Sequence, residues 1–204
     1  MTATDTLRCF GTGDALYEHY HDHEWGHPVH GEAALFERLT LEGAQSGLSW
    51  LTVLRKREGY REAFAGFDAA VVARWGEAEV ERLMNNPGIV RNRRKIESTL
   101  SNARALVALW DAGETLDEIV WSYQPLDATP ADAGTADAGT ADAGPRTWVD
   151  IPALTPESTA LARDLKRRGF TWLGPTTVYA AMQACGLVND HLVTCPARAL
   201  TPRG

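Results

Sequence analysis

Two strong metal ligands lie close together near the C-terminus of this 204-residue chain. His191 and Cys195 are separated by three residues in the segment GLVNDHLVTC, residues 186–195. Imidazole nitrogen and thiolate sulfur are ligands that zinc prefers, and a structural zinc site normally takes four of them. The segment therefore supplies half of a zinc site, and the other half must come from elsewhere.

The N-terminal region offers the two missing ligand types. Cys9 precedes an expected helix and His21 lies within it. Together with His191 and Cys195 they make a Cys₂His₂ set, which would leave no position open for water and give the metal a structural role. Spacing alone does not choose His21, because further histidines crowd this region: His19, His23, His27 and His30.

Composition bounds the class of protein. The length and a hydrophobic content of 44% suit one domain, or two small helical lobes sharing a core. We find no apolar run that predicts a signal peptide or a membrane span, so we expect a cytoplasmic protein without a membrane partner. Three cysteines are an odd number, which favours metal binding or burial over disulfides.

The net charge of −7 is unevenly distributed. A tandem repeat of Ala, Asp, Gly and Thr at 129–144 lacks large apolar residues, and we interpret about 127–145 as a flexible loop insertion in a single 1–204 domain. Basic runs could form a local face for DNA or be ordinary solvated helix faces. These runs are 55–57, 91–95 and 166–168.

Apolar residues recur at helical spacing outside the insertion, and no alternating strand pattern stands out. Asp14, Ser49 and Thr155-Pro156 sit where N-terminal helix signals belong. The fold class predicted is all-α. The expected helices are 14–25, 32–45, 49–64, 77–84, 93–110 and 158–168.

Four blocks of the sequence resemble the 3-methyladenine DNA glycosylase I family, in the helix-hairpin-helix DNA glycosylase superfamily. They are YHDHEWG (20–26), LEGAQSGLSWLTVLRKRE (41–58), LKRRGF (165–170) and MQACGLVNDH (182–191). The resemblance implies a monomeric base-excision repair enzyme acting on double-stranded DNA that contains alkylated adenine. It also implies one structural Zn²⁺ that ties the termini through Cys9, His21, His191 and Cys195. The segment CFGTGDALY lacks the family's tryptophan after the cysteine, and Phe10 is the candidate replacement.

A glycosylase must hold a flipped base between aromatic walls and read its edge with hydrogen bonds. The candidate base-binding residues are Tyr17, Tyr20, Trp25, Glu42 and Trp50. Aromatic residues at helical spacing more often belong to the core. Glu42 favours a binding pocket over core packing, because a carboxylate in an apolar helix must reach solvent or have a buried partner.

The expected chemistry follows from the charge of the lesion. Alkylation at ring position three makes adenine cationic and a good leaving group, so selective capture by Glu42, the candidate catalytic residue, is most of the task. Trp50 would stack on the purine with a cation–π component. Asp190 is a candidate catalytic aspartate by position, but the interpretation preferred is a hydrogen bond to the zinc ligand His191.

DNA binding is predicted in the run LKRRGFTWLGPTTVYAAM, residues 165–182, which reads as helix, turn and helix. Its candidate contacts are Gly169, Gly174, Thr176 and Thr177. Gly47 and Leu48 are candidates to fill the gap left by the flipped base. The segment 85–95 resembles a second hairpin, or simply joins two core helices.

Two other functions compete with the glycosylase reading. A zinc-stabilised DNA-binding module would need the hairpin but no pocket for Glu42. A zinc hydrolase would need an open metal position.

Overall fold

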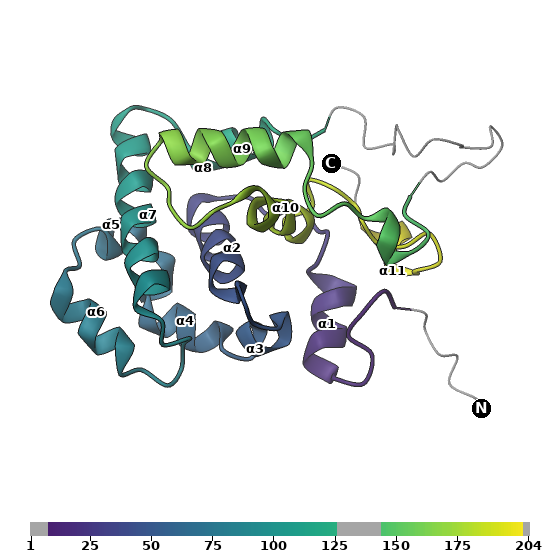
Figure 1. The fold of residues 1–204 in the computed structure, drawn as a ribbon, viewed down its shortest axis with the longest axis horizontal. Coiled ribbons are helices and arrows are strands. Elements are labelled where there is room, and N and C mark those ends of the chain that lie inside the picture. The colour runs from purple at the N-terminus through teal and green to yellow at the C-terminus, as the bar shows by residue number, and fades with distance from the viewer. Residues whose placement is uncertain (1–7, 126–143, 202–204) are drawn as a thin grey trace. The chain divides into compact units, whose positions relative to one another are not determined.

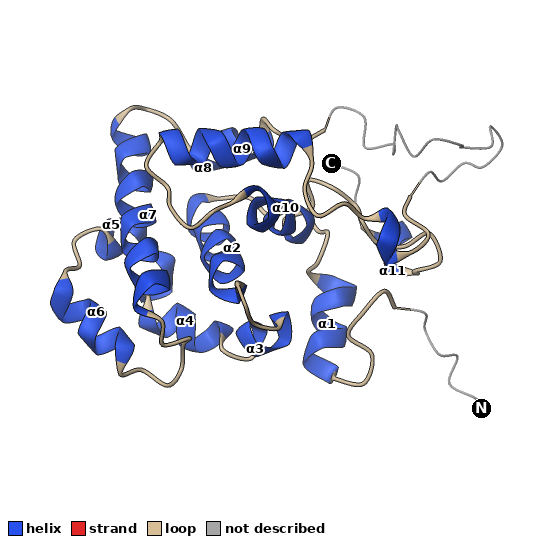
Figure 2. Ribbon diagram, in the orientation of Figure 1, coloured by secondary structure: helices blue, strands red, loops and turns tan. Residues whose placement is uncertain are grey.

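The computed structural model describes residues 8–125 and 144–201, and within these ranges all regular elements are helices, as predicted (Figures 1 and 2). The predicted loop insertion falls almost entirely outside these ranges. The chain divides into two compact units. The first comprises Met1–Pro28, Gln124–Ala153 and Met182–Gly204, and the second comprises Val29–Tyr123 and Leu154–Ala181.

The first unit brings together the two ends of the described chain. It contains α1 (Ala15–His23), the 3₁₀ helix η2 (Trp148–Asp150), α11 (Ala197–Leu200) and the last residues of α10 (Pro175–Ala184). Asp14 caps α1 as predicted, because its side chain accepts a hydrogen bond from the Tyr17 backbone N–H. Gly186 lies just after α10, has a φ of +76° and packs against residues 26–28. An added Cβ there would lie 2.6 Å from the Gly26 carbonyl oxygen, so only glycine fits.

The second unit is built around α7 and α2, which pack against each other (Figure 1). The α7 face toward the core carries Ile96, Leu100, Ala103 and Leu106, all buried. The helices of this unit are α2 (Glu32–Gln45), α3 (Trp50–Leu54), α4 (Arg57–Ala63), α5 (Ala69–Val72), α6 (Glu77–Met84), α7 (Arg93–Asp111), α8 (Leu116–Trp121) and α9 (Pro156–Arg167), with the 3₁₀ helix η1 (Ala65–Phe67) and the start of α10.

The helix predicted over 49–64 is two helices, α3 and α4, which are separated at residues 55–56. Ser49 caps α3 as predicted. After the break, α4 lies directly against the 85–92 connection, where an added Cβ on Gly59 would be 2.4 Å from the Gly88 carbonyl oxygen. Ile89 in this connection is buried. These contacts support the simpler interpretation of 85–95, a packed joint between α6 and α7.

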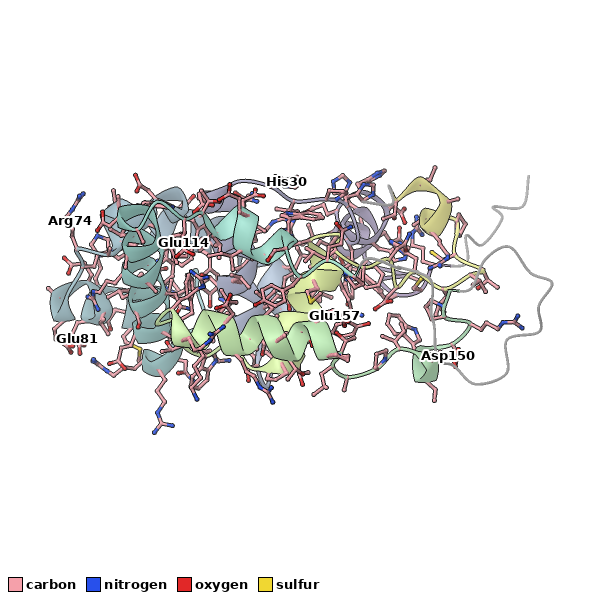
Figure 3. The ribbon with its side chains drawn as sticks, turned by 90° about the horizontal axis from the view of Figure 1, so that it is seen from above. His30, Arg74, Glu81, Glu114, Asp150 and Glu157 are labelled. Atoms are coloured by element: carbon pink, nitrogen blue, oxygen red, sulfur yellow. The ribbon has the colours of Figure 1, made fainter. Side chains whose placement is uncertain are left out.

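The three basic runs do not form one uniformly free cationic face. Lys56 donates to the Pro87 carbonyl oxygen at 2.6 Å, and Arg93 pairs with Glu77, Glu81 and Glu97. Arg168 donates to Asp164 at 3.0 Å and to Glu114 at 2.6 Å, and Glu114 is labelled in Figure 3. Much of the positive charge is therefore balanced locally. None of the described helices has the length and apolar character needed to cross a membrane.

Candidate functional site

The four predicted metal ligands converge in the first unit. Their ligand atoms, from Cys9, His21, His191 and Cys195, all lie within 4.8 Å of one another. The Cys195 Sγ atom is 3.5 Å from His21 Nε2 and 3.6 Å from His191 Nδ1, and Cys9 Sγ is 3.7 Å from His191 Nδ1. A tetrahedron with zinc bond lengths of about 2.0–2.3 Å has edges of about 3.3–3.8 Å. The group therefore fits a zinc ion.

Each histidine is held by a partner on its other ring nitrogen. His21 Nδ1 lies 2.8 Å from Asp22 Oδ1, and His191 Nε2 lies 3.1 Å from the Trp25 carbonyl oxygen. Arg8 in turn donates to both Asp22 oxygens, which is the main reason that the pKa of Asp22 falls to about 2. These contacts direct one nitrogen of each ring toward the thiols, as metal-binding histidines require.

The prediction that Asp190 hydrogen-bonds to the His191 ring is wrong. Both nitrogens of the His191 ring face other groups, namely the thiols and the Trp25 carbonyl. Asp190 instead accepts a hydrogen bond from Gln183 Nε2 at 2.7 Å. The adjacent backbone still serves the ligand group, because the Leu192 N–H donates to Cys9 Sγ at 3.2 Å.

Burial favours the neutral forms of Cys9 and His191 in the absence of a cation. It raises the pKa of the Cys9 thiol to about 12 and lowers the pKa of His191 to about 4. His191 is therefore neutral at physiological pH, as a metal ligand must be. A buried thiolate, by contrast, needs a neighbouring positive charge, which a divalent metal would supply.

Aromatic side chains surround Phe10 next to the ligand group. The Phe10 ring centroid lies 5.0 Å from that of Tyr17 and 5.1 Å from that of Trp25, and Tyr20 lies 6.5 Å away. Trp148 lies 6.0 Å from Phe10 and donates its indole N–H to the Cys9 carbonyl oxygen. Phe10 and Trp148 thus belong to one aromatic cluster beside the ligand group. Three of the predicted base-binding residues belong to this cluster.

Glu42 and Trp50 belong to the second unit, on either side of one turn. Glu42 lies on α2 with only 6% of its surface exposed, and Trp50 is the buried first residue of α3. Burial raises the pKa of Glu42 to about 8, although the positive charge of Arg38 acts in the opposite direction. The carboxyl group is therefore largely protonated at neutral pH, and a cation bound beside it would favour the carboxylate.

The turn between these two residues is exposed. Gly47 has a φ of +80°, which suits glycine, and Leu48 is 40% exposed. An exposed leucine at the tip of a turn is the kind of side chain that can enter a base stack.

The segment predicted to bind DNA contains the end of α9, a connection at 168–174 and most of α10. Gly169, Gly174 and Thr176 are exposed, and Thr177 is half-buried. The Gly174 carbonyl accepts a hydrogen bond from the Val178 N–H, so Gly174 lies at the start of α10. The space around its Cβ position is empty, and the first backbone N–H groups of the helix have no partners within the helix. This geometry suits an anion such as a DNA phosphate.

Sequence reasoning missed the residues that connect these parts of the second unit. Lys95 on α7, Asn102 about two turns further along the same face and Trp172 in the 168–174 connection all hydrogen-bond to backbone groups of neighbouring segments. Lys95 belongs to a basic run that suggested a solvated surface, so no local signal separated it from its neighbours. Asn102 lies in an expected helix and Trp172 in the run predicted to bind DNA, but no pattern distinguished either residue from its neighbours.

The chain is similar to known proteins along most of its length. The methyladenine glycosylase family profile matches residues 10–199. DNA-3-methyladenine glycosylase of Haemophilus influenzae is 41% identical over 95% of this chain and 98% of its own length. DNA-3-methyladenine glycosylase 1 of Escherichia coli is 45% identical over 89% of this chain and 91% of its own length.

Solved structures give the same result. A crystal structure of 3-methyladenine DNA glycosylase I has a TM-score of 0.82 and 45% identity, covering 93% of this chain and 98% of that one. The Staphylococcus aureus enzyme, in a structure described as the basis of 3-methyladenine recognition, has a TM-score of 0.82 and 36% identity, covering 95% of this chain and 97% of that one. With similarity of this extent in sequence and in fold, the chain belongs to the methyladenine glycosylase family.

Proposed function

We propose that this protein is a DNA-3-methyladenine glycosylase, a base-excision repair enzyme that hydrolyses the bond between 3-methyladenine and its deoxyribose. The observation that carries the proposal is identity of 41–45% over 89–95% of the chain to enzymes of that name. Similarity to a 3-methyladenine DNA glycosylase I in complex with 3-methyladenine supports the substrate. The activity requires a site for a flipped, cationic purine.

Glu42 and Trp50 are the residues of the second unit that fit this task. The buried Glu42 carboxyl has no competition from bulk water, so a hydrogen bond from the purine edge would be strong there. Trp50 supplies an aromatic face for the positively charged ring. Tyr17, Tyr20 and Trp25, which belong to the first unit, are also proposed as base-binding residues.

The reaction itself needs little acid catalysis. Water adds to the anomeric carbon of the sugar, the glycosidic electron pair leaves with the purine and neutralises its positive charge, and the water proton passes to solvent. Glu42 favours the cationic base over neutral adenine, so it acts by selecting and holding the leaving group. Asp190 is not needed for this step.

We also propose one structural zinc ion, held by Cys9, His21, His191 and Cys195. The distances between their ligand atoms and the partners of both histidine rings support it. With four protein ligands the metal would have no open position, which disfavours a zinc hydrolase. The bound ion would tie residues near the N-terminus to residues near the C-terminus and stabilise the first unit.

For DNA binding we propose a helix-hairpin-helix formed by α9, the 168–174 connection and α10. Gly169, Gly174, Thr176 and Thr177 would contact the backbone of double-stranded DNA, giving affinity without sequence preference. Gly47 and Leu48 would occupy the space that the flipped base leaves. The protein would act as a monomer in the cytoplasm.

One incubation tests the proposed function. Methylated duplex DNA is treated with the protein, and the released bases are separated by chromatography. Free 3-methyladenine is expected, with intact adenine retained in the DNA. Binding without release would instead support a DNA-binding module that lacks catalysis.

A further inference from the structure

Lys95 is a buried lysine whose ammonium group ends on the backbone of another helix. Only 8% of its surface is exposed. Its Nζ donates to the Ala44 carbonyl oxygen at 2.8 Å and to the Ser46 carbonyl oxygen at 2.5 Å. A protonated amine has no lone pair to offer as a nucleophile, and two backbone oxygens accept from this ammonium group. Its role therefore depends on the backbone segment that it binds.

The segment that Lys95 holds is the C-terminal end of α2. The last carbonyls of a helix have no partners within it and carry partial negative charge, so a cation there is favourable. The last turn of α2 contains no basic residue of its own. Lys95 supplies the missing charge from α7.

All four carbonyls at this helix end have donors. Besides those of Ala44 and Ser46, the Gln45 carbonyl accepts from the Leu48 N–H at 2.6 Å, and the Gly43 carbonyl accepts from Trp172 Nε1 at 3.1 Å. The turn that follows, with Gly47 and Leu48 exposed, therefore begins from a fully satisfied helix end. A turn built this way has little freedom to shift.

Trp172 connects the same helix end to the DNA-binding hairpin. It lies in the 168–174 connection with a φ of +64°, which is strained for a tryptophan. An added Cβ on Gly43 would lie 3.4 Å from the Trp172 ring, so glycine at 43 permits the close approach. Beside it, Asn102 accepts from the Thr171 N–H at 2.7 Å and donates to the Thr171 carbonyl at 3.1 Å.

Helix α7 thus holds two segments from one face. Lys95 and Asn102 are seven residues apart, which is close to two full helical turns. The first side chain fixes the turn after α2, and the second fixes the hairpin connection. The spacing between these segments is set by one helix, whose core-facing side chains are buried.

We propose that Lys95 is a positioning residue for extrusion of the damaged base. It fixes the Gly47-Leu48 turn relative to the α9–α10 hairpin, so that backbone binding by the hairpin brings Leu48 to the base stack in register. The inference rests on the proposed glycosylase function. Lys95 touches neither the base nor the sugar, and its effect passes through the Ala44 and Ser46 carbonyls.

The test compares two duplexes that carry a single 3-methyladenine, one with thymine opposite the lesion and one with an abasic site opposite it. Extrusion costs less when the lesion has no pairing partner, so a well-placed Leu48 matters less. Lys95→Met, which keeps the length of the side chain but removes the charge and donors, should release the paired base at least roughly ten-fold more slowly. Release of the unpaired base should fall by no more than about three-fold.

Lys56→Met is the matched control, because it removes another lysine-to-carbonyl hydrogen bond, to Pro87, away from this turn. It should leave the ratio of the two rates at the parent value. The ratio does not depend on how much of a preparation is folded, and Lys95→Gln provides a second variant if Lys95→Met does not fold.

Equal loss on both duplexes, or no loss on either, would overturn the positioning role. Those outcomes differ from failure of the proposed function itself, in which the parent protein would release 3-methyladenine from neither duplex.

Discussion

The Nδ1 atom of His21 lies 2.8 Å from the Oδ1 atom of Asp22, its neighbour in sequence, and this contact turns the other ring nitrogen toward Cys195. Such partners commonly contribute ten- to a hundred-fold to metal affinity. Asp22→Asn should therefore lower zinc affinity by about that factor, measured by competition with a chromophoric chelator. Asp14→Asn, on the same helix, keeps a good cap and should leave zinc affinity unchanged. Equal affinities for both variants would contradict this role for Asp22.

Removal of zinc should destabilise the first unit. With the metal absent, the buried thiols and imidazoles lose their common partner, and the segments around Cys9 and His191 lose a link that spans most of the sequence. Chelation should lower the melting temperature and speed amide hydrogen exchange near both residues. Metal analysis that finds no zinc in the purified protein, or full zinc content in His191→Ala, would refute the site.

The hairpin is tested best at Gly174. An added Cβ there meets nothing within 4 Å and its φ is not positive, so Gly174→Ala should fold normally. The methyl group would instead stand where a phosphate approaches the start of α10. We expect affinity for all duplexes, damaged or not, to fall by roughly three- to ten-fold. Fluorescence anisotropy over a range of salt concentrations measures it.

Gly76→Ala is the control for that experiment, because Gly76 also precedes a helix and also has open space around its Cβ position. It should not change DNA affinity. A change in lesion preference with unchanged affinity in Gly174→Ala would remove the hairpin assignment.

The sequence predicted the helices and ligands whose evidence is local. Residues 32–45 were expected to form a helix and form α2, because the apolar period in this segment is regular and long. Cys9 and His191 come together as the resemblance implied, although they are distant in sequence. Residue type, apolar period and helix caps are local features, and the sequence predicts the structure that depends on them.

The sequence does not predict which side chains hydrogen-bond to backbone carbonyls. The acceptors of Lys95 and Trp172 are main-chain atoms, which have the same chemistry at every position and leave no trace in the sequence. Lys95 follows two arginines, so its burial was hidden in a run typical of a surface. The preferred role of Asp190 failed for the same reason, because the Trp25 carbonyl takes the place expected for its carboxylate.

The final prediction concerns Glu42 and the pH dependence of folding. Burial raises its pKa from 4.5 to about 8, so between these values the folded protein holds a proton that the unfolded chain has released. Stability must then fall as pH rises through this window, by at most roughly 1.4 kcal/mol per pH unit from this group. The glutamine in Glu42→Gln cannot titrate, so this variant should lose this part of the pH dependence of the unfolding free energy. Urea unfolding of both proteins at several pH values measures the difference, with the exposed Glu62→Gln as the control that retains it.

The same variant separates a structural role of Glu42 from base recognition. Glutamine keeps the size of the side chain but cannot become a carboxylate, so affinity for 3-methyladenine should fall by roughly ten- to a hundred-fold while the protein stays folded. Nuclear magnetic resonance titration with the free base measures this affinity. Trp50→Ala should weaken base binding independently, through the loss of a stacking face. If Glu42→Gln changed only the pH dependence of unfolding and bound the base as tightly as the parent, Glu42 would be a buried core carboxyl with no part in recognition.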